Sequence, residues 1–352
     1  EEIYEATERK QEHEYRVTPK TQRELYLEGV EEQEDEQNIS LVGDWSTQKY
    51  VGNKLGGKYL RAPDIFFTIL EKGEGKLIPL GKVAKIKAGI ITGNNSKFYQ
   101  IWHSKGQIPN GWEPAFKSPR DVHTIKLRKE NACHLIKIRN APFKIKRAPL
   151  LWPDLRGARH ICHYNLDNLP FEHRFHGIIP EKTDKVKEFC AILNSTLIAF
   201  LLEVFARTSL GGGAAYLLTS DLKNLLVPNL NYFDSNQQNS LIDAFERLSQ
   251  RPIHSIFEEL GFTLCPQRKG CQHPEHPLEY VQPETLSLAQ VANASPDRFE
   301  LDRVVFDVLG LTDEERLEVY RAVAQLVRDR LLKAKSVKKK KQSTQRGAVY
   351  AC

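Results

Sequence analysis

Apolar residues change their spacing once along this chain, near Pro180, and this change limits the folds that the sequence can adopt. Before it, short apolar runs alternate with Gly, Pro and Asn, which is the pattern of strands joined by tight turns. The strands are expected at residues 65–70, 76–80, 83–91, 98–102, 124–127 and 135–138. After it, apolar residues recur at i, i+3 and i+4, which predicts amphipathic helices. The sequence therefore predicts an α+β fold, with a strand-rich domain followed by a mainly helical C-terminal region.

The helices of the second half have recognisable start and stop signals. They are expected at residues 183–204, 221–226, 240–260, 296–309 and 313–331. Arg251-Pro252 is expected to kink or divide the third of them. Thr312 and Glu315 form a capping box that opens the last.

Composition divides the chain into five segments. Residues 1–44 are expected to be an acidic connector, since the first 36 residues hold 13 acids and 5 bases. The main folded domain is expected at 45–260, followed by a loop region with Pro, Cys and His at 261–294, a helical tail at 295–335 and a disordered basic tail at 336–352. The sequence contains no Met and opens on Glu1, which we interpret as a piece of a longer polypeptide.

Positive charge is concentrated in one third of the chain. Residues 46–160 carry 23 Lys and Arg against 7 Asp and Glu, a net charge of +16, whereas the whole chain has +6. Lys and Arg neutralise phosphates, aromatic side chains stack on bases, and Asn and Thr hydrogen-bond base edges. The interleaving of these residue types favours a nucleic-acid binder over a protein with scattered charge. An RNA-binding module stays open as an alternative.

The segment 85–99, KIKAGIITGNNSKFY, is the most specific one. Apolar-alternating halves flank a Thr-Gly-Asn-Asn sequence, which is typical of a hairpin turn. The turn offers a hydroxyl, two amides and neighbouring ammonium groups, which suit a loop laid into a DNA groove. The candidate DNA contacts are Lys85, Lys87, Thr92, Asn94, Asn95 and Lys97. The alternative is an ordinary hairpin in which the Asn residues only tolerate positive φ.

A second basic stretch follows, and it contains a tryptophan. Its candidate DNA contacts are Arg139, Lys144, Lys146, Arg147 and Trp152. The cations suit backbone phosphates and the indole suits one stacked base. The alternative is a solvated charge run beside a core tryptophan.

Two patterns raise the question of metal chemistry. Pro63-Asp64 with Glu74-Gly75-Lys76 imitates a pattern of metal-dependent nucleases, although Glu74 and Lys76 are expected in a turn and the pattern is common by chance. A self-contained nuclease or methyltransferase that uses unassigned carboxylates is therefore an alternative. Four candidate zinc ligands, at spacings unusual for zinc sites, are Cys265, Cys271, His273 and His276.

Several features exclude other classes of protein. No glycine-rich phosphate-binding sequence and no Asn-Pro-Pro-aromatic sequence occur. The longest apolar run, 196–206, contains Glu203 and is too short to cross a bilayer, so no membrane partner is expected. The six cysteines are far apart and no signal peptide is present, which indicates a reducing cytoplasm.

Five segments occur in an order that resembles a known family. They are YLRAPD at 59–64, GIITGNNSKFY at 89–99, FKSPR at 116–120, AILNS at 191–195, and GGG at 211–213 followed by Leu222 and Val227-Pro228. Together they resemble the TaqI-like C-terminal specificity region of adenine-specific DNA methyltransferases, a group that includes single-chain restriction–modification enzymes. The resemblance covers roughly residues 45–260, and 295–335 resembles the helical tail of many of these proteins.

The resemblance implies a DNA-reading role for the domain at 45–260. In the family, a preceding catalytic domain binds S-adenosylmethionine and places a flipped adenine against an Asn-Pro-Pro-aromatic motif. Neither motif is in this chain, so we expect no catalytic residue and no cofactor in it. The partners implied are double-stranded DNA and an upstream methyltransferase domain. Thr92, Asn94 and Asn95 would face the target, the helix bearing Asn194 and Ser195 would be scaffold, and Arg61, Lys117 and Arg120 are further candidate DNA contacts.

Overall fold

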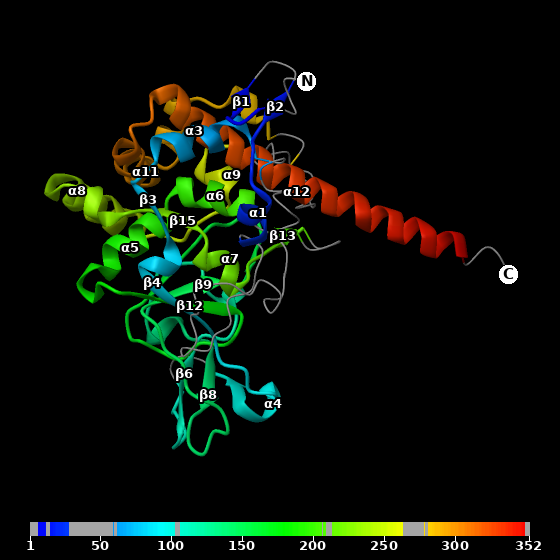
Figure 1. Ribbon diagram of the computed structural model, residues 1–352. Coiled ribbons are helices and arrows are strands. Elements are labelled where there is room, and N and C mark those ends of the chain that lie inside the picture. Colours follow the sequence, from blue (N-terminus) through cyan, green and yellow to red (C-terminus); the bar gives the residue numbers. More distant parts are fainter. Residues whose placement is uncertain are drawn as a thin grey trace. The chain divides into compact units, whose positions relative to one another are not determined.

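The computed structural model describes residues 6–11, 15–27, 59, 62–102, 106–205, 207–208, 213–262, 278 and 281–348. They belong to two compact units, Glu1–Asp64 and Ile65–Cys352 (Figure 1). The division falls after Asp64, whereas the sequence places the start of the main domain at residue 45; residues 45–58 lie outside the described part of the chain.

The first unit contains one small hairpin and one short helix. Strands β1 (Lys10–Gln11) and β2 (Arg16–Val17) pair antiparallel. Helix α1 (Gln22–Leu27) begins after Thr21, whose backbone N–H and hydroxyl both donate to the Glu24 carboxylate, at 2.7 and 2.9 Å. Local capping and pairing therefore give this polar stretch structure without a large apolar core.

The second unit is built on a five-stranded sheet with the order β4-β12-β9-β11-β7. Its strands are β4 (Ala84–Ala88), β7 (Lys126–Leu127), β9 (Leu150–Pro153), β11 (His163–Asn165) and β12 (Phe175–Pro180). All neighbours are antiparallel except β11 and β7. The central strands β9 and β12 are almost wholly buried, whereas the edge strand β4 alternates between buried and exposed residues. One face of β4 is therefore available to solvent.

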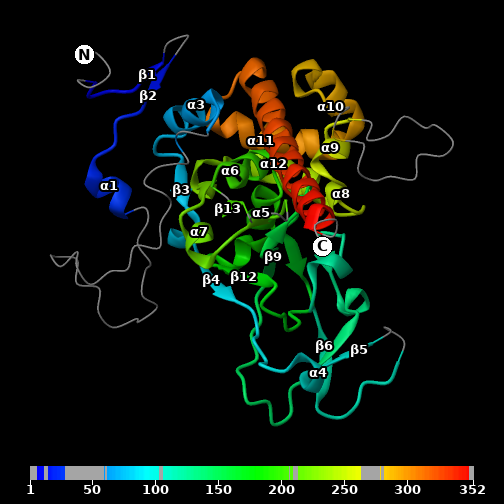
Figure 2. The ribbon, with the colours of Figure 1, turned by 90° about the vertical axis from the view of Figure 1, so that its right-hand side faces the viewer.

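A smaller sheet with the order β5-β8-β6 lies at one end of this unit, and helices α8 to α11 lie at the other (Figures 1 and 2). Its strands are β5 (Tyr99–Ile101), β6 (Trp112–Ala115) and β8 (His134–Lys137), and helix α4 (Asn95–Phe98) precedes β5. The remaining strands are β3 (Leu77–Pro79) with β15 (Leu226–Pro228), and β10 (Leu155–Arg156), β14 (Ala215–Tyr216) and β13 (Arg207–Thr208).

Most helices follow the last strand of the large sheet. They are α5 (Val186–Leu193), α6 (Thr196–Phe205), α7 (Thr219–Lys223), α8 (Ser235–Leu248), α9 (Ile256–Glu259), α10 (Leu288–Ala294), α11 (Pro296–Leu309) and α12 (Asp313–Ala348), with α3 (Asp64–Lys72) before the sheets. Helix α11 packs against α8 and α6, and α12 packs against α6. This confirms the predicted α+β fold with a mainly helical C-terminal region.

The strand predictions hold at five of the six expected positions. Strands β3, β4, β5, β7 and β8 fall within or across the expected ranges. The prediction at 65–70 is wrong, because these residues belong to helix α3. The run contains four buried residues, Ile65, Phe66, Phe67 and Ile69. It therefore lacks the clear alternation of apolar and polar residues that would distinguish a strand from a helix.

The helix expected at 183–204 is divided at Asn194-Ser195 into α5 and α6. The buried Asn194 amide nitrogen donates to the carbonyls of Cys162 and Cys190, both at 2.8 Å, and its oxygen accepts from Cys162 N–H at 2.9 Å. The side chain thus ties the bend to the chain beside it. No single helix among the described residues is long and apolar enough to cross a membrane, although the pair 183–193 and 196–205, bent by 74°, has the length and composition to do so.

The C-terminal predictions are confirmed at their caps and wrong at the end of the chain. Pro252 divides the helix expected at 240–260 into α8 and α9, as predicted. Thr312 N–H donates to the Glu315 carboxylate at 2.7 Å, which confirms the capping box that opens α12. Helix α12 runs to Ala348, so the backbone of 336–348 is helical and not disordered. Lys, Ala, Gln and Arg all favour helix, and no Pro interrupts the run.

Candidate nucleic-acid interface

The loop 89–97 connects the two sheets and carries the Thr-Gly-Asn-Asn sequence. The predicted hairpin is wrong: β4 pairs with β12 in the large sheet, whereas β5 pairs with β8 in the small one. A β-carbon on Gly89 would lie 2.3 Å from the Glu172 carbonyl oxygen, so the loop begins with a close backbone approach that only glycine permits. Gly93 has φ +70°, the left-handed conformation that glycine adopts at no steric cost.

The amides of this loop are exposed, the Thr92 residue is half-buried, and these polar groups are partly engaged with one another. Asn94 caps helix α4, since its side-chain oxygen accepts from Lys97 N–H at 3.1 Å and from the Ser96 hydroxyl at 2.8 Å. The Thr92 hydroxyl donates to the Asn95 side-chain oxygen at 2.6 Å. Within the described residues, neither amide nitrogen has a hydrogen-bond partner. Asn94 and Asn95 therefore combine turn chemistry with free donor groups that face solvent.

The segment 139–147 supports this loop from one side. Lys146 Nζ donates to the carbonyls of Ala88 at 2.9 Å and of Gly89 at 3.1 Å. The Phe143 and Phe98 rings meet edge to face with centroids 5.0 Å apart. Ile138, Phe143 and Ile145 pack on the buried cluster of Ile90, Tyr99, Ala115 and Ile136. Lys146 therefore contacts the backbone at the start of loop 89–97 directly.

The cations of this segment divide into two kinds. Lys146 holds the loop. Arg147 Nη2 donates to both carboxylate oxygens of Glu113, at 2.6 and 2.8 Å, and Arg147 Nη1 donates to the Asn168 carbonyl at 2.8 Å. Lys144 and Arg139 are exposed. Lys144 lies between Phe143 and Ile145, which pack inward. Among the described residues, Lys144 and Arg139 have no partner, whereas Lys146 and Arg147 have partners in the protein.

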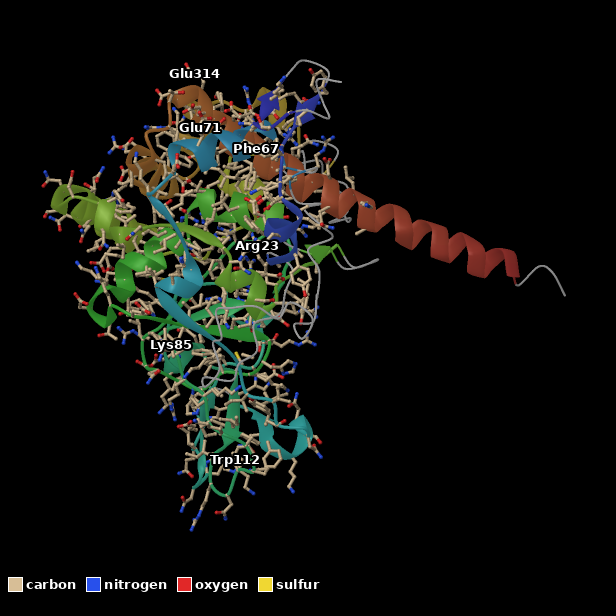
Figure 3. The ribbon with its side chains drawn as sticks, in the orientation of Figure 1. Arg23, Phe67, Glu71, Lys85, Trp112 and Glu314 are labelled. Carbon is tan, nitrogen blue, oxygen red and sulfur yellow. The ribbon has the colours of Figure 1, made fainter. Side chains whose placement is uncertain are left out.

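The lysines on the neighbouring elements also have side chains that are exposed to solvent. Lys85 and Lys87 alternate with the buried Ala84 and Ile86, so both occupy the exposed face of edge strand β4 (Lys85 is labelled in Figure 3). Lys97 is exposed on α4, with its ammonium 5.4 Å from the centre of the Phe98 ring. Lys85 and Lys87 precede loop 89–97 in the sequence and Lys97 is its last residue, so both ends of the loop carry positive charge.

Two further cations lie on the connection after β6. The Lys117 ammonium lies 5.5 Å from the centre of the buried Tyr99 ring. Arg120 is exposed, in a turn capped by Ser118.

Burial, together with the charge of Glu172, raises the pKa of Tyr99, so its phenol stays protonated. Glu172 was missed by the sequence reasoning; its backbone bridges to Ile90, and it supports the loop from beneath.

Trp152 takes no part in any exposed surface. The side chain is 0% exposed on strand β9, and its ring contacts the His160 ring edge to face at 6.0 Å. The expected base-stacking role is therefore wrong, and the alternative of a core tryptophan is correct. Its position in a strand buried on both faces explains the burial.

Several predicted site residues lie outside the described part of the chain. They are Arg61 and the four candidate zinc ligands Cys265, Cys271, His273 and His276. Among the described residues, no group of three or more His, Cys, Asp or Glu side chains is arranged to hold a metal ion. Glu74 and Lys76 flank Gly75 in a turn, as expected, and Gly75 has φ +73°.

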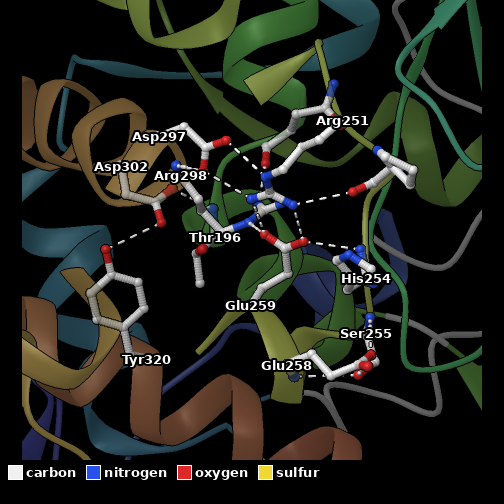
Figure 4. Close-up of polar contacts among 12 residues, drawn as sticks. Thr196, Arg251, His254, Ser255, Glu258, Glu259, Asp297, Arg298, Asp302 and Tyr320 are labelled. Atoms are coloured by element: carbon white, nitrogen blue, oxygen red, sulfur yellow. Dashed lines mark hydrogen bonds and ion pairs between the residues drawn. The ribbon is translucent and has the colours of Figure 1, made fainter. Parts of the chain in front are cut away.

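The opposite end of the unit contains charged groups of a different kind, which we call the helical-end network: Arg251, Glu259, Asp297 and Arg298 (Figure 4). Arg251 forms paired hydrogen bonds with both carboxylates, all at 2.7–2.8 Å. The buried Arg298 donates to Glu259 at 2.8 Å and to the Asn194 carbonyl at 2.8 Å. Burial alone would raise the pKa of Glu259, but the charge of Arg298 and the hydrogen bonds from both arginines hold this pKa well below its usual range. The network joins α9 and α11 to the bend at Asn194.

Comparisons with known proteins find similarity of fold only. No known family model and no curated protein matches the sequence. Solved structures of similar fold include the following three. The type IIG restriction endonuclease BpuSI gives a TM-score of 0.45 and 11% identity, over 72% of this chain and 34% of that chain. The HsdS subunit from Thermoanaerobacter tengcongensis gives 0.33 and 12%, over 72% and 51%.

The third structure is the type IIL restriction-modification enzyme MmeI, which was solved in complex with DNA. It gives a TM-score of 0.36 and 11% identity, over 70% of this chain and 36% of that chain. This chain thus matches between about a third and a half of the length of these three proteins. It is structurally similar, at low identity, to parts of restriction–modification proteins.

Proposed function

We propose that the unit Ile65–Cys352 recognises double-stranded DNA by sequence, as the specificity part of an adenine-specific DNA methyltransferase or restriction–modification enzyme. The observation that carries the proposal is loop 89–97. Its amide nitrogens face solvent without partners among the described residues, and Lys146 fixes its backbone. Base contacts specify a sequence only when the groups that make them are held in register.

The surrounding charge supplies the second requirement of a DNA-binding surface. Lys85, Lys87, Lys97 and Lys144 are exposed and lie on the elements that flank or contact the loop. Cations in such positions bind phosphates of any sequence and fix the position of the duplex. The loop then distinguishes base pairs, and the lysines supply most of the affinity.

Methyl transfer is assigned to a catalytic domain outside this sequence. The sequence contains no G-x-G-x-x-G segment of the kind that binds S-adenosylmethionine and no Asn-Pro-Pro-aromatic motif. S-adenosylmethionine is therefore proposed as a cofactor of the parent enzyme, and the proposed share of this chain is to choose and hold the DNA. Calorimetric titration of the chain with S-adenosylmethionine should give no binding; stoichiometric binding would favour the self-contained methyltransferase instead.

The direct test is a salt series of DNA-binding measurements by fluorescence anisotropy. A mixed-sequence duplex of about 20 base pairs should bind more weakly as salt rises, and the double variant Lys85→Ala/Lys87→Ala should lower the logarithmic salt slope by about two. The matched control is Arg303→Ala, which removes an exposed cation from α11 and should leave the slope unchanged.

Three outcomes would contradict the proposed function. The first is an absence of duplex binding at low salt, and the second is an equal loss in the Arg303→Ala control. The third is equal competition by duplex RNA of the same sequence, because A-form RNA does not present a major groove that a loop can read. That third outcome would favour the RNA-binding alternative.

A further inference from the structure

Ile91 is an apolar side chain that the fold leaves exposed to solvent. Its neighbour Ile90 is 1% exposed and packs in the cluster beneath the loop, whereas Ile91 is 65% exposed. Isolated exposed apolar residues are common on protein surfaces and need no explanation by themselves. Ile91 differs because of how firmly it is held and what lies beside it.

The backbone on both sides of Ile91 is fixed. Ile90 N–H donates to the Phe171 carbonyl at 2.9 Å, and the Ile90 carbonyl accepts from His173 N–H at 3.1 Å. On the other side, the hydrogen bond from Thr92 to Asn95 and the Asn94 cap close the loop. A side chain on such a support loses little conformational freedom when it meets a ligand.

The groups next to Ile91 define the ligand that would cover it. Thr92, Asn94 and Asn95 are polar, and lysines border the loop, so an apolar protein surface would leave these groups unpaired. A DNA major groove presents hydrogen-bonding base edges along its whole length and one apolar group, the C5-methyl of thymine. An amide beside it is suited to the N6 and N7 atoms of an adenine.

We propose that Ile91 reads thymine, by packing on the C5-methyl group of an A·T base pair in the major groove. This inference rests on the proposed function and assigns a specificity-determining contact to a residue that the sequence motif did not single out. The asparagine amides read neighbouring hydrogen-bonding edges, and Ile91 detects the methyl group that they do not sense.

The test begins with a selection. The 352-residue chain and its Ile91→Ala variant are each used to enrich a randomised duplex library, and the enriched sequence is then made with uracil in place of thymine at one position at a time. Uracil removes only the C5-methyl group. For the unaltered chain, one such replacement should weaken binding about fourfold, which corresponds to about 0.8 kcal/mol for one buried carbon.

The Ile91→Ala variant should bind the thymine and uracil duplexes equally and should accept more than one base pair at that position. The matched control is Ile101→Ala, which removes the same apolar group from the 74% exposed Ile101 on edge strand β5. This control should select the same sequence as the unaltered chain and keep its preference for thymine.

The outcomes separate this inference from the proposed function. If the unaltered chain enriches a sequence but no uracil replacement weakens binding, or if Ile91→Ala keeps the preference for thymine, the assignment to Ile91 is overturned and sequence recognition stands. If the unaltered chain enriches no sequence, both are overturned. Equal weakening on all sequences by Ile91→Ala and Ile101→Ala would show a non-specific apolar effect and would also overturn the assignment.

Discussion

The two ends of the second unit use polar groups in opposite ways. In the helical-end network, the side chains of Arg298 and Glu259 are each about 1% exposed, and they form a hydrogen-bonded ion pair with one another. In loop 89–97 the amides are exposed and only their oxygen atoms have partners. Charged and polar groups that are mutually satisfied hold the fold together, whereas groups left half-satisfied at the surface are available to a ligand. This difference supports a structural role for the helical end and agrees with the recognition role that we propose for the other end.

The largest expected effect comes from breaking the helical-end network. Arg298→Met leaves Glu259 and the buried Asp302 without their main cation, and should lower the free energy of unfolding by about 3–5 kcal/mol in urea titration. Arg303→Ala, an exposed change on the same helix, should stay within about 0.5 kcal/mol. An equally small effect for Arg298→Met would show that the network is not structural.

The next largest effect is expected on acidification. Burial lowers the pKa values of His160, His163 and His176, that of His163 to about 4, so the folded state favours their neutral forms. A histidine with a depressed pKa gives stability that is present above its unfolded pKa of about 6.5 and is lost as the pH falls. His163 alone contributes on the order of 3 kcal/mol to the loss between pH 6.5 and pH 4.

Asp302 opposes this loss in part. Burial raises its pKa to about 6, so its protonation as the pH falls below that value favours the folded state. The free energy of unfolding should therefore decrease as the pH is lowered across this range. In His163→Gln it should decrease less per pH unit. The exposed His254→Gln is the matched control and should keep the original slope. A His163→Gln variant with an unchanged slope would contradict this account.

At the other end of the unit, smaller effects on selectivity are expected. Serine also caps helices well, so Asn94→Ser keeps α4 but removes the amide donor. It should relax the selected sequence at one position, with a loss of about 1–3 kcal/mol in discrimination and little change in non-specific affinity. Competition between selected and scrambled duplexes measures both quantities. If Asn94→Ser and Asn95→Ala both leave the discrimination between sequences unchanged, the two asparagines only stabilise the turn and do not contact bases.

The smallest effects separate two lysines that are two residues apart. Lys144→Ala should lower the salt slope of DNA binding by about one without changing stability, because its side chain is exposed. Lys146→Ala should lower the unfolding free energy by about 1–2 kcal/mol, because the Ala88 and Gly89 carbonyls lose a charged donor. Reversed results for the two variants would contradict the assignment of Lys146 to the support of the loop and of Lys144 to DNA binding.

The sequence predicts those parts of the fold that local signals determine. The Thr312–Glu315 capping box, the division at Pro252 and the exposed alternation of Lys85 and Lys87 depend on spacings of a few residues. Helix α3 escapes prediction because four of the six residues at 65–70 are buried, and so short an apolar run has no clear alternation that distinguishes a helix from a strand. The bend at Asn194 escapes because its cause, the Cys162 backbone, lies far away in the sequence.

The sequence predicts the turn that carries the candidate site, but not how the turn is connected to the sheets. The Gly, Thr and Asn residues of loop 89–97 indicate a turn, but pairing partners decide between a hairpin and a crossing from one sheet to another. A basic residue type does not reveal whether a cation is free, as Lys144 is exposed while Arg147 is paired with Glu113. Ile91 carries a weak signal, since it is the second of two adjacent isoleucines, and only one of the two can be buried by a strand.

Photocrosslinking tests the central claim most directly, namely that the end of the unit with the small sheet holds the DNA. Duplexes that contain 5-iodouracil in place of thymine are irradiated with the 352-residue chain, and the crosslinked peptides are identified by mass spectrometry. The account predicts crosslinks within residues 85–97 and 139–147, which disappear when unlabelled duplex competes. Crosslinks confined to helices α8 to α11, with none in loop 89–97, would contradict it.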